Sequence, residues 1–301
     1  MKRLKTTLAA ASCLFLLASC QWNAGKQEKT ATSTQTKETV SNPEPSKAQP
    51  VKKNGKLTFS SYTYSDKKHI DNNSELPGCS IDISLTYPTG GDTGNSTVAA
   101  LQRLFVNALP QEMQGSTSPR TAAEQYVQNY IAEYEAEIKP YIKKRKHRDE
   151  GWMNYETIIH SKNLYNANRF WGFSIECYSF TGGAHGMTTT SYTVVDLNSG
   201  KVLSLNDLFA ESDYNLISRM LRQQLADDLG TTVDKLGEKS YEADNIVVDD
   251  NFMISDSGIT WLFNPYDIAP YSTGTTRITL PYRAIVGYLV ASSPLKRIAL
   301  K

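Results

Sequence analysis

Alternating apolar and polar positions predict several β-strands in this chain. From Cys79 to Tyr87 the odd positions are apolar and the even positions are polar, and the same period of two runs from Trp171 to Cys177. This spacing is typical of strands with one buried face. By similar patterns we expect further strands at residues 57–64, 155–159, 169–180, 192–196, 202–203, 252–254, 259–263 and 277–280.

Apolar residues three and four positions apart predict helices between these strands. The predicted helices cover residues 95–109, a long segment that begins after Ser118-Pro119, residues 216–229 and residues 281–290. Pro140 interrupts the long segment and predicts a kink or a break there. Strands and helices come in segregated groups with hairpin turns, which predicts an α+β fold of antiparallel sheets and packed helices.

The first twenty residues indicate an exported protein with a lipid anchor. A short cationic start precedes the apolar run Leu8–Leu17, which is shorter than the roughly 18 residues of a membrane-spanning helix. Leu17-Ala18-Ser19-Cys20 resembles a bacterial lipobox, so we expect residues 1–19 to be a signal peptide and Cys20 to be lipidated. Residues 20–55 are polar and predict a flexible tether. We expect an extracytoplasmic lipoprotein, placed at the outer membrane and facing the periplasm.

The charge balance bears on possible partners, and the cysteines bear on a possible disulfide. The chain has 32 Lys and Arg against 31 Asp and Glu, a balance that gives no general attraction to nucleic acid. Two cysteines, Cys79 and Cys177, remain beyond the leader and both lie on the apolar faces of predicted strands. The sequence leaves open whether they form a disulfide or two buried thiols.

Candidate chemistry is sparse. The segment Gly182-Gly183-Ala184-His185-Gly186 surrounds a histidine with glycines, which suits either a tight strand connection or a ligand contact. We expect His185 to be a buried, hydrogen-bonded side chain rather than a general base. The sequence contains no nucleophile elbow, no clustered metal ligands and no phosphate-binding glycine loop. We therefore predict no catalytic residues, no metal and no cofactor.

Three segments together resemble the RsiV-like extracytoplasmic domain family: residues 178–186, 195–209 and 263–274. The N-terminal half resembles the module that precedes the catalytic part of peptidoglycan deacetylases of the PdaC type, whose catalytic motifs are absent from this sequence. The resemblance implies two tightly associated subdomains, 56–186 and 187–301. It also implies a tethered binding module, because the family includes a sensor whose outer domain binds lysozyme.

The same resemblance suggests where a ligand would contact the chain. We expect the ligand-binding residues to include His185, Gly183, Tyr266 and Tyr271. The expected ligand is a glycan hydrolase such as lysozyme or the cell-wall glycan, peptidoglycan. A sigma-factor regulator is not expected, since cleavage at a lipobox would leave no segment inside the cell. The alternative is an envelope hydrolase that uses His185.

Overall fold

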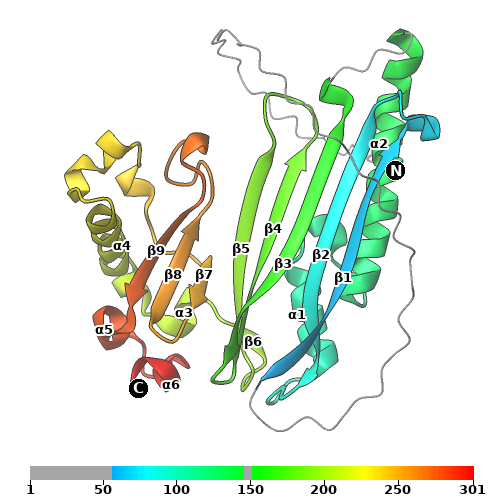
Figure 1. Cartoon of the computed structure of the whole chain (residues 1–301). Coiled ribbons are helices and arrows are strands. Elements are labelled where there is room, and N and C mark those ends of the chain that lie inside the picture. Colours follow the sequence, from blue (N-terminus) through cyan, green and yellow to red (C-terminus); the bar gives the residue numbers. More distant parts are fainter. Residues whose placement is uncertain (1–55, 146–150) are drawn as a thin grey trace, which may run out of the picture. The chain divides into compact units, whose positions relative to one another are not determined.

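A six-stranded sheet with the order β1-β2-β3-β4-β5-β6 is the largest element of the structure, a computed structural model that describes residues 56–145 and 151–301 (Figure 1). Its strands are Leu57–His69, Gly78–Gly91, Tyr155–Ala167, Phe170–Phe180, Met187–Asp196 and Lys201–Val202. Neighbouring strands are antiparallel except for β2 and β3, which are parallel. Parallel neighbours need a long crossover, and two helices provide it. The α+β prediction is confirmed.

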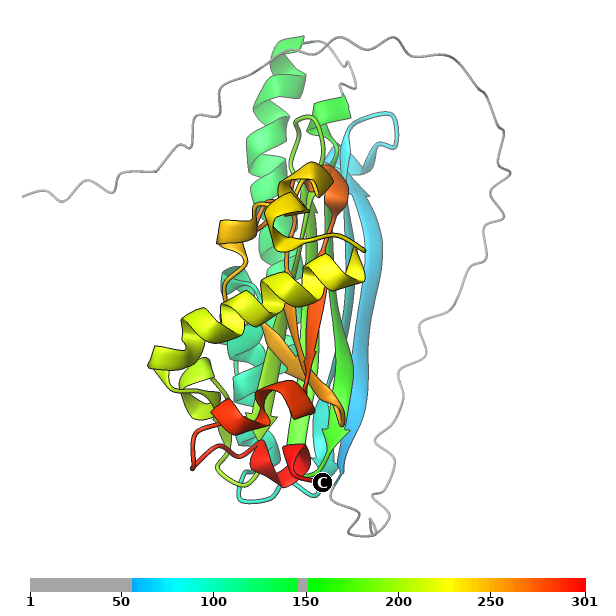
Figure 2. The same cartoon turned by 90° about the vertical axis from the view of Figure 1, so that its left-hand side faces the viewer.

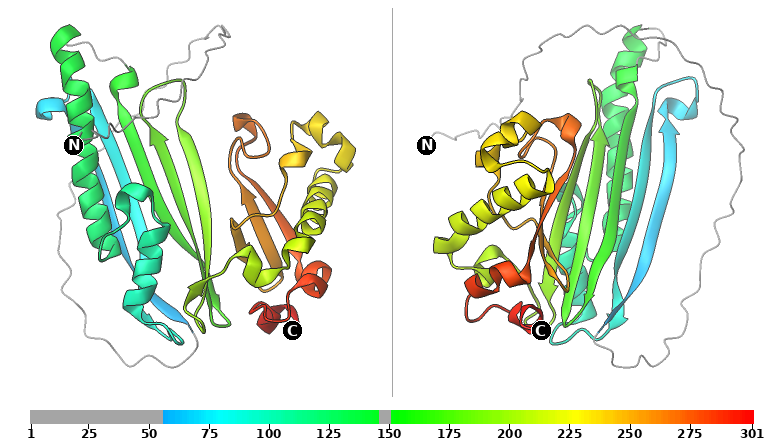
Figure 3. Two further views of the ribbon diagram at one scale, coloured as in Figure 1. Left: turned by 180° about the vertical axis from the view of Figure 1, so that it is seen from behind. Right: turned by 60° about the vertical axis from the view of Figure 1, so that its left-hand side comes forward.

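These two helices cover one face of the large sheet (Figure 3). They are α1, Val98–Ala108, and α2, Pro119–Arg145; of the expected kink or break at Pro140, the break is absent, because α2 continues through this residue. The odd positions of β4, from Trp171 to Ile175, point toward the helices and are buried with residues such as Phe105 of α1. The alternation read from the sequence therefore identified the helix-covered face of β4.

A second, three-stranded sheet faces the other side of β4 and β5. It consists of β7, Phe252–Ile254, β8, Gly258–Phe263, and β9, Thr276–Pro281, all antiparallel. Phe170 and Val194 of the large sheet share a core with Trp261 of the small one. Gly172 permits this close packing, because a Cβ there would lie 2.5 Å from the sulfur of Met253.

The remaining helices belong mainly to the C-terminal part of the chain. Helix α4, Tyr214–Asp228, packs on β9 and crosses in front of the small sheet in Figure 2. The other short α-helices are α3, Leu205–Leu208, α5, Tyr282–Ile285, and α6, Lys296–Ala299. The 3₁₀ turns are Ile70–Asn72, Gln111–Met113, Gly151–Met153, Glu211–Asp213, Val233–Lys239, Ala243–Asn245, Tyr271–Thr273 and Val286–Tyr288.

The change from one sheet to the other falls after β6. The boundary expected between residues 186 and 187 cuts through the large sheet, because β5 pairs with β4 from Met187 to Asp196. All described residues belong to one compact unit. The glycine-rich segment Gly182–Gly186 is therefore a hairpin connection within the large sheet and not a link between subdomains.

Two asparagine side chains cap the outer edge of β5. Strand β6 pairs only with Val195 and Asp196, which leaves the rest of this edge without a neighbouring strand. Asn264 Oδ1 accepts a hydrogen bond from the backbone N–H of Thr190 at 2.6 Å, and its Nδ2 donates to the Thr190 carbonyl at 3.1 Å. Asn251 Oδ1 accepts from the N–H of Tyr192 at 2.7 Å. These amides satisfy an edge that would otherwise invite strand pairing.

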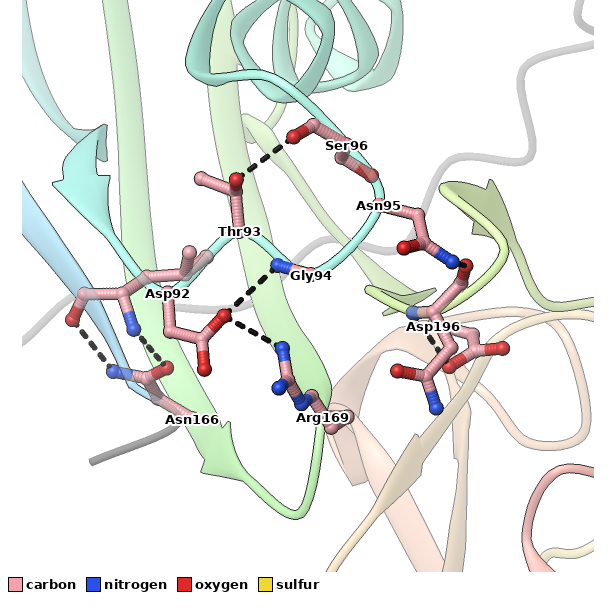
Figure 4. A network of polar contacts seen from close by, with 10 residues as sticks. Asp92, Thr93, Gly94, Asn95, Ser96, Asn166, Arg169 and Asp196 are labelled. Atoms are coloured by element: carbon pink, nitrogen blue, oxygen red, sulfur yellow. Dashed lines mark hydrogen bonds and ion pairs between the residues drawn. The ribbon is translucent and has the colours of Figure 1, made fainter. Parts of the chain in front are cut away.

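A polar network joins the loop between β2 and α1 to the β3–β4 and β5–β6 turns at one end of the large sheet (Figure 4). Asn168 and Arg169 have φ values of 52° and 65°, which form the tight turn between β3 and β4. The Arg169 guanidinium donates to Asp92 at 2.6 Å, and Asp92 also accepts from the N–H of Gly94. Beside it, the buried Asp196 accepts from Arg297 of α6 at 2.5 Å. The C-terminal helix is thereby attached to the large sheet.

The expected signal peptide, residues 1–19, and the expected tether, residues 20–55 with Cys20, lie outside the described residues. Within residues 56–145 and 151–301, no helix is both long enough and apolar enough to cross a membrane.

The Asn264 cap gives a stability prediction. The substitution Asn264→Ala leaves the N–H of the buried Thr190 without its partner. We expect a loss of about 1–3 kcal/mol in the free energy of unfolding, measured by urea denaturation. Asn163→Ala is the matched control, because Asn163 is exposed on β3 and its side chain forms no hydrogen bond with any described residue. Equal stability of the two variants would contradict the role of the cap.

Candidate binding site: an aromatic stack formed by two loops

The first loop of the site joins β4 to β5 and depends on its glycines. Gly182 and Gly183 have φ values of 88° and 111°, a region that favours glycine. Position 186 requires glycine for a different reason, because a Cβ there would lie 2.4 Å from the ring of Tyr178. The ring of Tyr178 therefore packs directly on the Gly186 backbone, and the loop presents His185 to solvent.

The second loop joins β8 to β9 and holds a tyrosine in an unusual conformation. Tyr266 has a φ of 74°, which is rare for a residue with a side chain. Its N–H donates to the carbonyl of Ala269 at 3.0 Å, and the N–H of Asn264 donates to the carboxylate of Asp267 at 2.6 Å. This turn keeps the Tyr266 side chain 56% exposed. Backbone strain that maintains an exposed aromatic ring is a reason to suspect function.

The two loops bring three rings together. The ring of His185 stacks on Tyr271, with centroids 4.2 Å apart and planes inclined by 22°. The ring centroid of Tyr271 in turn lies 5.8 Å from the ring centroid of Tyr266. Three of the four residues predicted to bind a ligand, His185, Tyr266 and Tyr271, thus form one aromatic stack. Gly183 shapes the loop, and a Cβ there would have nothing within 4 Å.

His185 differs from its prediction in one respect. Its Nδ1 hydrogen-bonds to the carbonyl of Gly186 at 2.9 Å, so the expected hydrogen bond is present. The side chain is exposed, however, because the loop turns the ring outward onto Tyr271 instead of into the core. Among the described residues, no carboxylate and no nucleophile bonds to this imidazole.

The two cysteines are free thiols and do not form the disulfide that the sequence left open. Cys79 on β2 pairs with Tyr155 of β3, whereas Cys177 on β4 pairs with Ile159 of β3. The thiols are therefore two strand spacings apart, about 10 Å, and offset by four residues, about 13 Å. A disulfide needs Cα atoms within about 7 Å.

Possible metal ligands are dispersed over the described ranges. No group of three or more His, Cys, Asp or Glu residues there could hold a metal ion. His69 hydrogen-bonds to the carbonyl of Leu76, and His160 contacts Asp82 at 3.2 Å, so each has its own local partner.

Two family models match separate segments of the chain. Residues 73–188 match a family model described as deacetylase PdaC, and residues 206–283 match one described as a protein of unknown function, DUF3298. The anti-sigma-V factor RsiV of Bacillus subtilis is 25% identical over 173 residues, which are 54% of this chain and 58% of RsiV. The chain is RsiV-like and carries a PdaC-type module.

Solved structures extend the likeness of this RsiV-like chain to most of its length. A DUF3298-family structure from Bacteroides fragilis matches with a TM-score of 0.75 and 27% identity, covering 82% of the chain and 99% of that structure. A DUF3298-family structure from Pseudomonas aeruginosa matches with a TM-score of 0.55 over 79% of the chain and 97% of that structure. At 18% identity, the latter supports the fold alone. RsiV itself is matched over little more than half its length.

Sequence reasoning missed the residue that positions the site. Asn264 lies in the segment 263–274 that carries the family resemblance, but no pattern in the sequence predicted a role for it. Its side chain fixes the β8–β9 loop to β5, directly beside the tyrosine turn. The available signal was the polar side chain of Asn264 directly after the apolar end of β8.

The Cys177 thiol gives a pH prediction. Burial and then the nearby Glu112 and Glu176 raise the pKa of this thiol to about 11. Only the thiolate reacts with iodoacetamide, so at pH 8 we expect alkylation roughly a hundredfold slower than for an ordinary cysteine. The rate should continue to rise up to about pH 11, measured by mass spectrometry of the Cys177 peptide. A rate that levels off by pH 9 would contradict this assignment.

Proposed function

We propose that this protein is an extracytoplasmic binding module, tethered at Cys20, whose ligand is a glycan hydrolase such as lysozyme. The observation that carries the proposal is the exposed stack of His185, Tyr271 and Tyr266. Aromatic residues are the side chains most enriched in the energetic centres of protein interfaces. Here they come from two loops that are already fixed by backbone and side-chain hydrogen bonds, so little ordering is needed on binding.

The relationship to RsiV supports an extracytoplasmic regulatory or binding module. RsiV is named an anti-sigma-V factor, and the similarity extends over 173 of its residues. The family resemblance read from the sequence suggests lysozyme as the ligand. Peptidoglycan is the other ligand that fits an aromatic surface, because sugar rings also stack on tyrosine; a binding assay can separate the two.

The alternative of a hydrolase that uses His185 has less support. General acid–base catalysis needs a partner that orients the imidazole and a reacting group within hydrogen-bond reach. Within the described residues, His185 hydrogen-bonds to a backbone carbonyl, and its ring is stacked on Tyr271. This arrangement suits a contact surface better than a proton-transfer site.

The central residue of the stack provides the test. Tyr271→Ala removes the ring that contacts both of the others, and we expect the dissociation constant for lysozyme to rise at least tenfold. Tyr288→Ala is the control, because Tyr288 is also an exposed tyrosine but stacks on no aromatic ring in the part of the chain that the structure describes. The measurement is biolayer interferometry with the full chain. An unchanged affinity of Tyr271→Ala for lysozyme would refute recognition by the stack. A protein that binds peptidoglycan fragments but does not bind lysozyme would refute lysozyme as the ligand.

The anchor is tested independently of the ligand. Cys20→Ala removes the sulfur that would accept the lipid, so we expect the protein either to leave the membrane fraction or to accumulate unprocessed. Cell fractionation with immunoblotting measures both outcomes, and Cys13→Ala within the expected signal peptide is the matched control. A processed Cys20→Ala protein that stays with the outer membrane would disprove lipid tethering at this residue.

A further inference from the structure

A groove runs along the helix-covered face of the large sheet and reaches the edge of β5, where Asn251 and Asn264 line its smaller hollow. It consists of two hollows of about 480 Å³ and 330 Å³ that share Pro110 and Cys177 in their linings. Volumes of this order are typical of sites for small molecules or single side chains. The groove lies where α1 and α2 leave the surface of β4 and β5 uncovered.

One wall of the larger hollow is a single face of α2. Tyr126, Asn129, Tyr130 and Glu133 line it, and their spacing of three, four and seven residues places them on one side of the helix. The rings of Tyr126 and Tyr130 stack with centroids 5.7 Å apart. The Tyr126 hydroxyl and the Thr157 hydroxyl are 3.0 Å apart, a hydrogen bond that holds this ring against β3.

The charge of the groove is negative and uncompensated. Glu112 and Glu133 line the larger hollow, and neither hollow is lined by a Lys, Arg or His side chain. Neither carboxylate forms an ion pair with any residue in the ranges 56–145 and 151–301. Both exposed carboxylates add to burial in raising the pKa of Tyr126, and Glu112 does the same for Cys177. Their field therefore reaches the floor and the wall of the groove.

We propose that this groove binds an organic cation, an ammonium or guanidinium group on a short aliphatic chain. The two carboxylates attract the charge, the tyrosine rings offer π-faces to a cation, and Ile159 and the neutral Cys177 thiol provide an apolar floor for the chain. The cation is either a free diamine or a basic side chain of a protein segment. None of the residues that line the two hollows belongs to the aromatic stack, and the proposal does not depend on the proposed function.

The test is isothermal titration of the full chain with two probes. Cadaverine represents a free diamine, and trilysine represents basic side chains on a peptide. We expect at least one probe to bind, with an affinity that falls between 50 and about 300 mM salt because exposed charges are screened. Binding of trilysine alone would assign the site to a protein segment. The neutral analogue 1-pentanol should not bind.

Matched variants connect the binding to the groove. Glu112→Gln and Glu133→Gln should each weaken binding at least threefold, and the double variant at least tenfold. Glu238→Gln makes the same charge change at an exposed position outside the groove and should have no effect. Asn129→Phe fills the mouth of the larger hollow without changing its charge and should also weaken binding. No binding of either probe, equal binding of 1-pentanol, or equal losses for Glu238→Gln and Glu112→Gln would overturn the proposal.

Discussion

The contact on which the rest of the structure depends is the pairing of two asparagine side chains with the edge of β5. Asn264 and Asn251 supply the hydrogen bonds that a seventh strand would supply, to Thr190 and Tyr192. Asn251 also donates to the carbonyl of Leu262, so the same side chain joins both sheets. Amides satisfy the backbone of β5 without extending the sheet, and an edge that could aggregate becomes a fixed junction.

The candidate binding surface is a consequence of that junction. His185 lies on a hairpin of the large sheet, whereas Tyr266 and Tyr271 lie on a loop of the small one. Their rings meet because Asn264, at the start of the second loop, is bonded to β5 a few residues beyond His185. The two faces of β4 thus have different uses. One side packs against the small sheet, and the other carries a negatively charged groove beneath α2.

Local patterns in the sequence predicted the elements better than their arrangement. The period-two alternation from Trp171 to Cys177 identified the helix-covered face of β4, since each odd residue there belongs to, or packs against, the core shared with α1 and α2. The parallel pairing of β2 with β3 was not predictable in the same way, because it depends on where a 27-residue helix returns the chain. The family resemblance pointed to His185, Tyr266 and Tyr271. The role of Asn264 needed the partner strand, and the separation of Cys79 from Cys177 needed the strand order.

The central claim is that the stack at the junction of the two sheets is the surface that meets the ligand. Hydrogen–deuterium exchange of the full chain, with and without lysozyme, tests it most directly, because it locates the contact without altering the protein. The account predicts slower exchange in the β4–β5 loop, residues 181–187, and in the β8–β9 loop, residues 264–275, with little change on the outer edge of β1. Protection confined to β1 or to α4, with both loops unchanged, would contradict it.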